Sequence, residues 1–418
     1  MPQALERKER LHKIIDLARV SKGWSRAQLA RSLGRDATKL YPESGNPKLD
    51  FLVRLAGVLE WPVGDVVEAI WGGRVTRSLD AEDDDGNITY ESLDAEALKA
   101  HREGRWADMV DVAHRQFAAA RTPAERALAC NREFGGWDGL GRYQNARDAA
   151  QRGLQYGPLP TVLRLQLQGN LANAYYALWD LTPALGISQV LIEWHDANPP
   201  EKKADGKRRA FAHYVRGNTF RRMMQAEPEN TDRLAPLAKA DLELSRQMYL
   251  DLAEALDDES LLGIANTCAA GILEVDAALG AVSGEEAIEQ VMTALEQVID
   301  LDANASGDLL ESYGWWCVFG SNIALRHLEG PALQQAMAIF TNKALEIADR
   351  LDNWSMRERV FSMQFRLHEV MTDTTGFRFD YTIDDEDRRL IAGAMGRFPR
   401  FRHTGWRILE TAKVVASA

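Results

Sequence analysis

Asparagine recurs within segments whose apolar spacing predicts helices, and it is the residue pattern in this chain best suited to binding chemistry. Asparagine is unfavourable inside a helix because its amide competes for backbone hydrogen bonds. Each amide offers one acceptor and two donors, so a row of amides can bind the backbone of an extended peptide. The six positions are Asn131, Asn170, Asn173, Asn218, Asn266 and Asn322.

Tyr176 and Arg216 lie in the same segments as these asparagines. The tyrosine could supply a side-chain pocket, and the arginine could capture a carboxylate. We interpret the eight residues together as a set that binds a short peptide or another small ligand. The alternative is that the amides bond to neighbouring turns or face solvent.

Local motifs for catalysis, metals or phosphate are missing from the sequence. The eight histidines are scattered, and Cys130, Cys268 and Cys317 lack metal-ligand or disulfide spacing. The glycine-rich segment 135–141 has no preceding strand and no following lysine, unlike a phosphate-binding loop. We therefore expect a protein that is not an enzyme and has no cofactor.

The elements that must position these side chains are predicted to be helical pairs. Three turn motifs, Gly104-Arg-Trp106, Gly141-Arg-Tyr143 and Trp179-Asp-Leu181, lie 37 and 38 residues apart, and an amphipathic helix follows each. A helix, a short turn and a second helix form the unit of a helical-pair solenoid. These stretches resemble tetratricopeptide repeats. In such a solenoid the first helix of each pair lines the inner surface, so the asparagines would face a groove.

The repeat domain is predicted over residues 95–373, and the chain is predicted to be all-α. Beyond Asp196 the period lengthens. Three further pairs are expected, at 207–224 with 234–256, 260–279 with 285–301, and 309–328 with 331–351. The sequence does not decide whether the repeats close into a compact ring or remain an open arc.

The last segment, residues 374–418, is expected to cap the solenoid or to form a dimer contact. Arginine and aromatic residues are interleaved from Arg397 to Leu409. This composition can bind nucleic acid, but at the end of an acidic solenoid we favour a capping helix or a dimer contact. Only residues 377–383 alternate as a strand would, and they are expected to form a short extended cap.

The first 71 residues predict a separate small helical domain. Ser25 is a favoured N-cap, an apolar stripe follows it at helical spacing, and Gly34 suits a tight turn. A second apolar stripe begins at Leu49, after a Gly-Asn-Pro loop signal. One more short helix is expected over residues 61–70.

This pattern resembles the lambda-repressor-like (Xre-type) helix-turn-helix family over residues 9–71. The resemblance implies a five-helix domain whose third helix enters the major groove of double-stranded DNA. The matching DNA-binding positions are Arg26, which faces phosphate, and Arg35, Thr38 and Lys39 in the recognition helix. The span that holds this helix is about three residues shorter than in the family, and Pro42 predicts that the helix ends near Tyr41.

Charge is divided unevenly along the chain. The net charge is −12, but the first 77 residues hold 14 Lys and Arg against 9 Asp and Glu, a net +5, which leaves −17 for the rest. Residues 72–94, with the acidic run that starts at Asp80, are expected to be a linker. A basic head on an acidic body fits a DNA-binding protein whose larger domain is repelled from the duplex.

The cysteines and the N-terminus bear on localisation. The three cysteines are expected to be buried thiols in a reducing cytoplasm. The N-terminus is charged and lacks the apolar core of a signal peptide, and no apolar run approaches the length that spans a bilayer. We expect a cytoplasmic protein with no membrane partner.

A head of this kind followed by such a solenoid resembles the peptide-pheromone-receptor transcriptional regulators of Gram-positive bacteria and their phages. The resemblance implies a homodimer whose groove binds a short peptide and thereby controls two DNA-binding heads. We therefore expect a sequence-specific, dimeric transcriptional regulator controlled by a peptide or small-molecule ligand. The alternative is a non-enzymatic scaffold whose head contacts protein rather than DNA.

Overall fold

The chain is almost entirely α-helical in the residues that the computed structural model describes, which are 2–44, 46–59, 63–71, 89–200, 205–300, 307–376 and 380–415. It divides into two compact units, Met1–Gly86 and Asn87–Ala418, which we call the head and the repeat unit. The predicted all-α class is confirmed. Most of the predicted linker lies outside the described residues, and helix begins at Tyr90, inside the range predicted as linker.

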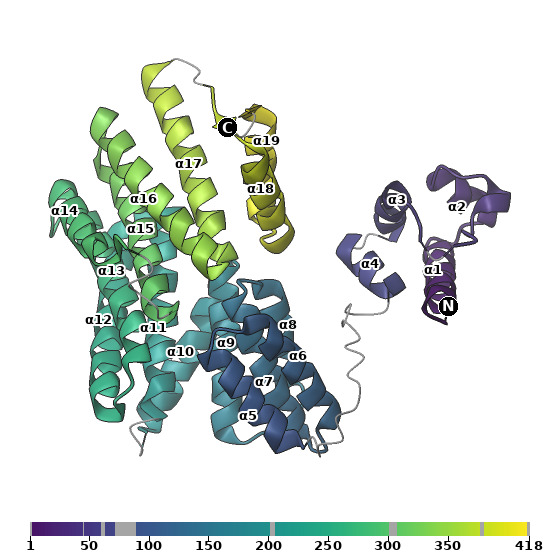
Figure 1. Ribbon diagram of the computed structural model, residues 1–418, viewed down its shortest axis with the longest axis horizontal. Helices are drawn as coiled ribbons and strands as arrows, with labels where there is room; N and C mark the ends of the chain where they lie inside the picture. Colours follow the sequence, from purple (N-terminus) through teal and green to yellow (C-terminus); the bar gives the residue numbers. More distant parts are fainter. Residues whose placement is uncertain are drawn as a thin grey trace. The chain divides into compact units, whose positions relative to one another are not determined.

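The head packs its helices around one apolar core (Figure 1). Its elements are α1 (Pro2–Ser21), α2 (Arg26–Ser32), the 3-10 turn η1 (Ala37–Lys39), α3 (Leu49–Leu59) and α4 (Val63–Trp71). Leu11 and Ile15 from α1 are fully buried with Leu29 from α2, Leu55 from α3 and Ile70 from α4. Each such side chain stabilises the fold by about 2 kcal/mol, so every helix contributes to holding the head together.

The head departs from expectation just before Pro42. The predicted recognition helix ending near Tyr41 is wrong, because the chain forms only the three-residue 3-10 turn Ala37–Lys39 there. Asp36 caps this turn by accepting the backbone N–H of Thr38 at 2.7 Å. Proline has no N–H with which to extend a helix and disfavours helical backbone before it, so the short span accommodates a single turn.

The repeat unit consists of successive helical pairs. Its elements are α5 (Tyr90–Arg102), α6 (Trp106–Ala119), α7 (Pro123–Gly139), α8 (Tyr143–Leu154), α9 (Thr161–Ala177), α10 (Leu181–Ala197), α11 (Gly206–Ala226), η3 (Pro228–Asn230), α12 (Thr231–Leu256), η4 (Glu259–Leu261), α13 (Leu262–Ala278), α14 (Gly284–Leu295), η5 (Glu296–Val298), α15 (Gly307–His327), α16 (Gly330–Leu351) and α17 (Trp354–Thr375). All the helices predicted beyond Asp196 are present. Only α14 is clearly shorter than predicted.

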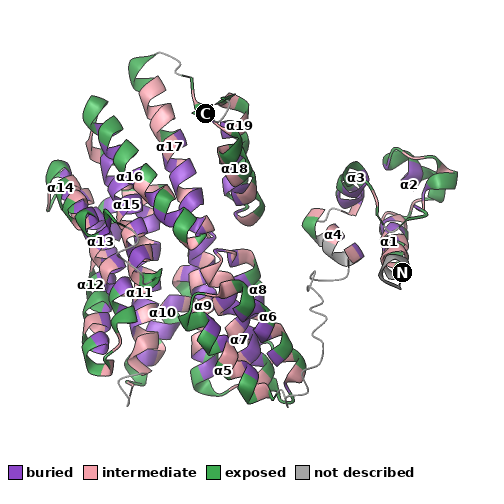
Figure 2. Cartoon of the chain, viewed as in Figure 1, coloured by how far each residue is buried: buried purple, intermediate pink, exposed green. Residues whose placement is uncertain are grey.

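The odd-numbered helices form one continuous layer. Each of α5, α7, α9, α11, α13, α15 and α17 contacts the next odd-numbered helix, while the even-numbered helices pack mainly against their neighbours in the chain. Figure 2 shows buried residues concentrated on helices such as α11 and α15 and exposed residues on α14. The first helices of the pairs therefore share one surface, as expected for a helical-pair solenoid.

The three predicted turn motifs are structurally equivalent. Gly104, Gly141 and Trp179 all have positive φ, at 68°, 62° and 65°. In each turn the next residue donates its backbone N–H to the carbonyl five residues earlier, the closure of a Schellman motif. Glycine suits this left-handed conformation, and Trp179 adopts it without that freedom. The aromatic or apolar residue two positions on then begins the second helix of each pair.

The repeat unit closes back on itself. The turn between α7 and α8 meets the start of α17, because a Cβ on Gly141 would lie 3.0 Å from the backbone nitrogen of Trp354. The ring of Tyr143 lies 6.5 Å from that of Phe398. Figure 1 shows the lower end of α17 beside the α8–α9 region. The repeats thus form a closed arrangement rather than an open arc.

The chain ends in a small cap that packs against α17 and against the α9–α10 turn. Its elements are β1 (Thr382–Ile383), α18 (Asp385–Arg397), α19 (Phe401–Thr411) and β2 (Lys413–Val414). Ile391, Phe401 and Ile408 are buried in one cluster with Phe361 of α17 and Leu178 of the α9–α10 turn. The predicted extended segment 377–383 is described only from residue 380, and its last two residues form β1.

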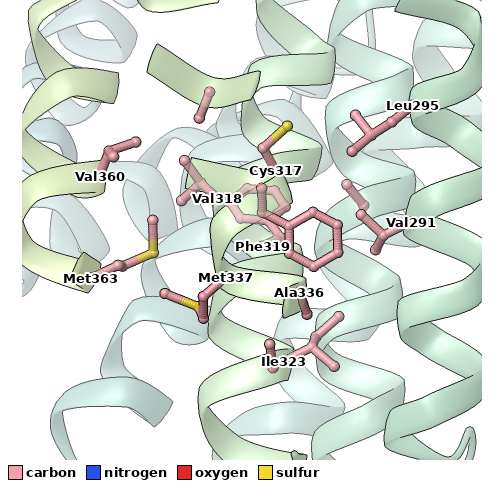
Figure 3. Packing of buried hydrophobic residues seen from close by; sticks show 14 of the residues in the cluster. Val291, Leu295, Cys317, Val318, Phe319, Ile323, Ala336, Met337, Val360 and Met363 are labelled. Carbon is pink, nitrogen blue, oxygen red and sulfur yellow. The ribbon is translucent and has the colours of Figure 1, made fainter. Parts of the chain in front are cut away.

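The largest apolar cluster joins α13 to α17. Figure 3 shows Phe319 of α15 packed among Val291, Leu295, Met337 and Val360. The helical segment Glu259–Ala278 is long and apolar enough to cross a membrane, with a mean hydropathy of 1.3, although the sequence analysis identified no such run. Its apolar window is 61% buried within the repeat unit, so interior packing accounts for its composition.

Candidate functional site

The candidate DNA-binding residues lie around the α2–η1 turn of the head. Ser25 begins α2 with a capping box: its side chain accepts the backbone N–H of Gln28, and the Gln28 side chain accepts the backbone N–H of Ser25 at 2.8 Å. Leu29 and Ala30 bury one face of the short helix. The opposite face is exposed, and it includes Arg26.

Two arginines hold the η1 turn in place. Arg26 donates from Nε to the Ala37 carbonyl at 2.8 Å, and Arg35 donates from Nη1 to the Lys39 carbonyl at 3.2 Å. The Arg35 guanidinium also lies 4.3 Å from the ring centroid of Phe51. A guanidinium has five N–H donors, so each arginine keeps donors beyond these contacts. The structure thus brings Arg26 and Arg35 to the two sides of one turn.

Thr38 and Lys39 are exposed on that turn. The Thr38 hydroxyl donates to the Asp36 carboxylate, and the two hydrogen bonds from Thr38, followed in effect by the charge of Lys39, lower the pKa of Asp36. Asp36 therefore remains ionised and caps the turn. A three-residue turn exposes fewer side chains than a longer recognition helix would.

The eight candidate ligand-binding residues fall into two groups. Asn170 and Asn173 of α9, Asn266 of α13 and Asn322 of α15 are half-buried on first helices. Each donates one amide N–H to an internal acceptor. These bonds are Asn170 to Asn131 (2.9 Å), Asn173 to Asp138 (3.2 Å), Asn266 to Ser312 (2.7 Å) and Asn322 to Glu274 (3.3 Å).

The other four candidates are enclosed by the protein. Asn131, Asn218 and Tyr176 are at most 8% exposed. Arg216 is held by Asp241, with both bonds at 2.7 Å, and by Gln189 at 2.5 Å. These four side chains are occupied in holding helices together. The four asparagines of the first group each keep one further amide N–H, and all four lie on the layer formed by the odd-numbered helices.

Asn218 and Asn322 belong to a network around a buried ion pair. Arg221 of α11 donates to Glu274 of α13 at 2.6 Å, and its Nε donates to Asn218 at 3.1 Å. Gln225 donates to the other Glu274 oxygen at 2.7 Å. The pair is satisfied on both sides, as a buried ion pair must be to avoid a large desolvation cost. It ties α11, α13 and α15 together.

Three carboxylates that no prediction from the sequence singled out, Asp138, Asp308 and Glu311, influence the ionisation of one another. Asp138 of α7 is half-buried, and burial, followed by the charges of Glu311 and Asp308 on α15, raises its pKa to about 7. Burial also raises the pKa of Glu311, although hydrogen bonds from Trp315 and Asn353 oppose this. Like charges near one another disfavour the ionisation of each group. No local motif signals this cluster, because its members come from helices far apart in the chain.

A buried arginine was also missed. Arg222 donates to the Tyr176 carbonyl, and its Cζ lies 3.8 Å from the ring centroid of Tyr176 and 4.6 Å from that of Trp179. Arg359 of α17 lies 4.8 Å from the same Trp179 ring. Burial lowers the pKa of Arg222. This stack joins α9, α11 and α17 where the repeat unit closes.

Metal binding and thiol reactivity concern the His, Cys, Asp and Glu side chains in the part of the chain that the structure describes. No group of three or more His, Cys, Asp or Glu side chains there is arranged to hold a metal ion. All three cysteines are buried. Burial raises the pKa of Cys268 to about 12, which disfavours the reactive thiolate.

Comparisons with known proteins include a distant structural likeness. No family model matches the chain, and no curated protein matches it. Among solved structures, it is similar to "Crystal Structure of Bacillus thuringiensis PlcR in complex with the peptide PapR7 and DNA". The match has 13% sequence identity and a TM-score of 0.30, and it covers 84% of this chain and 99% of that one.

Proposed function

We propose that the protein is a DNA-binding transcriptional regulator whose head binds double-stranded DNA through the α2–η1 edge. The observation that carries the proposal is the arrangement of Arg26, Arg35, Thr38 and Lys39 around one exposed turn. The net charge of +5 over the first 77 residues supports it, because phosphate contacts dominate affinity for DNA. The heads are expected to act in pairs on two half-sites.

Lys39 offers the sharpest test of this edge. Its side chain is exposed and makes no hydrogen bond or ion pair described for the head, so Lys39→Ala removes a charge with little effect on the fold. We expect the variant to bind duplex DNA several-fold more weakly and to reduce the slope of log affinity against log salt by about one. The measurement is fluorescence anisotropy with a labelled duplex at several salt concentrations.

Lys13→Ala is the matched control, because Lys13 is exposed on α1 outside the α2–η1 edge. It removes the same charge from the head. Equal losses of affinity in the two variants would mean that only the overall charge of the head attracts DNA. Undiminished binding by Lys39→Ala would remove this turn from the interface.

The repeat unit is proposed to hold the regulatory ligand, a short peptide or another small molecule, on the surface shared by its first helices. Asn170, Asn173, Asn266 and Asn322 are the residues best placed for this role, because each is half-buried and keeps one amide N–H. An amide can bind a peptide backbone without selecting its side chains, because it offers both donors and an acceptor. A ligand that favours one arrangement of the heads by 2 kcal/mol would change DNA affinity about thirty-fold.

A random peptide-display library selected against the full-length protein tests the ligand proposal. Peptides recovered in this way are expected to bind Asn173→Ala at least tenfold more weakly than the wild type. Asn198→Ala is the control, since Asn198 is exposed at the end of α10, outside the first helices. Recovered peptides that bind both variants equally well would place the binding site elsewhere.

A scaffold is the second candidate function, favoured by two features of the head. Its η1 turn has three residues in place of a recognition helix. Leu49 and Val53, one turn apart on α3, are 68% and 49% exposed, an apolar pair suited to a protein contact. This candidate predicts no DNA binding at low salt and unchanged partner binding by Lys39→Ala. The anisotropy measurement therefore separates the two functions.

A further inference from the structure

The cap presents an unpartnered apolar surface at the end of the chain. Trp406 of α19 is 58% exposed, and Val414 and Val415 are 49% and 47% exposed. Trp406 and Val414 line an open depression of about 740 Å³. Its lining residues are Ile383, Asp385, Arg388, Arg389, Ala392, Trp406, Leu409 and Val414. An exposed tryptophan beside exposed valines is typical of an interaction surface.

The strand at this surface has one open edge. β2 pairs with β1 in parallel, and Lys413 and Val415 both donate their backbone N–H groups to β1, at 2.7 and 3.0 Å. Backbone groups of successive residues in a strand point to opposite edges. The N–H and C=O of Val414 therefore point away from β1, and they have no backbone partner among the described residues. An open edge of this kind is a template for another strand.

The charges around the depression favour a second copy of the chain as the partner. The lining holds one carboxylate, Asp385, and two arginines, Arg388 and Arg389, all exposed. Within one copy Asp385 pairs with Arg388 at 3.1 Å, so a second copy would exchange this pairing across the interface. A charged surface that pairs with itself about a two-fold axis is self-complementary when it carries both signs of charge. A strand edge is likewise self-complementary, since each strand offers both donors and acceptors.

We propose that two copies of the chain pair through this surface, with β2 antiparallel to the partner's β2 and Val414 on the two-fold axis. The two Val414 residues then exchange both backbone hydrogen bonds, and Trp406 of each copy covers the depression of the other. This deepens the proposed function, which requires two heads in one assembly. Only the biological role of the pairing rests on the proposed function. The contact between the two copies does not involve DNA and can be measured in its absence.

Cysteine cross-linking tests the register of this pairing. A hydrogen-bonded antiparallel pair places its Cα atoms about 5.5 Å apart, within the 4.4–6.8 Å range of disulfides. Val414→Cys is therefore expected to form a covalent dimer under mild oxidation. Val415→Cys is the matched control, because one residue from the axis the Cα atoms are about 8 Å apart. The three native cysteines are buried and do not interfere.

Analytical ultracentrifugation tests the contact without a cross-link. Val414→Pro removes an N–H that β1 does not use, so the β1–β2 bonds remain, and dimerisation is expected to weaken at least tenfold. Trp406→Ser is expected to do the same through the apolar contact. His403→Ala, exposed on α19 outside the depression, is expected to leave the dimer unchanged. Circular dichroism verifies that each variant is folded.

Two outcomes would overturn the proposal. A wild-type protein that stays monomeric up to high concentration would exclude a second copy as the partner and leave the edge for another protein. A wild-type dimer that persists in both Val414→Pro and Trp406→Ser, and that Val414→Cys does not cross-link, would place the dimer contact elsewhere. None of these readouts involves DNA, so a failure here is distinguishable from a failure of the head to bind DNA.

Discussion

Asp138→Asn is expected to stabilise the protein at alkaline pH. Burial, followed by the charges of Glu311 and Asp308 on α15, raises the pKa of Asp138 from the ordinary 3.8 to about 7. In the folded state the carboxyl therefore keeps its proton over a pH range in which the unfolded chain loses it. By linkage the free energy of unfolding falls as the pH rises from about 4 to 7, and is level above that.

The size of the effect follows from the shift in pKa. Each unit corresponds to 1.36 kcal/mol, so a rise from 3.8 to about 7 sets an upper limit of about 4 kcal/mol for the stability lost above pH 7. Asp138→Asn removes the charge and keeps an oxygen that can accept from Asn173. The variant is expected to match the wild type near pH 4 and to exceed it by 1–4 kcal/mol at pH 8.

Urea unfolding of the two full-length proteins at pH 5 and pH 8, followed by circular dichroism, measures this difference. Asp111→Asn is the control, because Asp111 is an exposed carboxylate on α6, and its substitution is expected to give the same small change at both pH values. The measured quantity is the free energy of unfolding of Asp138→Asn minus that of the wild type. If this difference is no larger at pH 8 than at pH 5, the reasoning is refuted. Such a result would mean that α7 and α15 do not bring these carboxylates together.

Two further predictions concern the closure and the interior of the repeat unit. Gly141→Ala should cost more stability than Gly104→Ala, by about 1–3 kcal/mol in urea unfolding, because both have positive φ but only Gly141 lies against Trp354. Equal costs would show that the α7–α8 turn does not meet α17. None of the three native cysteines should react with a thiol reagent at pH 8 before unfolding, because all are buried; reaction in the folded protein would indicate that the helical layers open.

The sequence predicted the repeat unit well where the signal is local. Gly104, Gly141 and Trp179 were aligned from spacing alone, and all three adopt the same left-handed turn with the same backbone closure. This works because neighbouring residues determine where a helix ends, how the chain turns and which apolar residue begins the next helix. The helices of the later pairs were placed for the same reason, since each has its own apolar period.

The head shows the limit of such local reasoning. Pro42 correctly predicted that a helix could not continue past it. The hydrogen bond from the Thr38 backbone N–H to the Asp36 side chain, which caps a 3-10 turn rather than a longer helix, depends on geometry that the sequence does not show. The four DNA-binding positions remain a prediction. The structure adds that Arg26 and Arg35 also hold the turn, so substituting them affects the fold as well as any DNA contact.

The inner surface of the repeat unit was the least predictable part. The asparagines were identified by type and placed on first helices, but their partners, such as Asp138 for Asn173, come from other helices. The approach of Asp138 to Glu311 depends on how tightly the repeats curve. Small rotations between successive helical pairs set that curvature, and no single residue encodes them.

Selection of duplexes from a random DNA library by the full-length protein, at low and then at rising salt, tests the central claim most directly. The account predicts enrichment of paired half-sites, with affinity that falls steeply as salt rises and that weakens in Lys39→Ala. A folded protein that enriches no sequence and binds no duplex at low salt would contradict it.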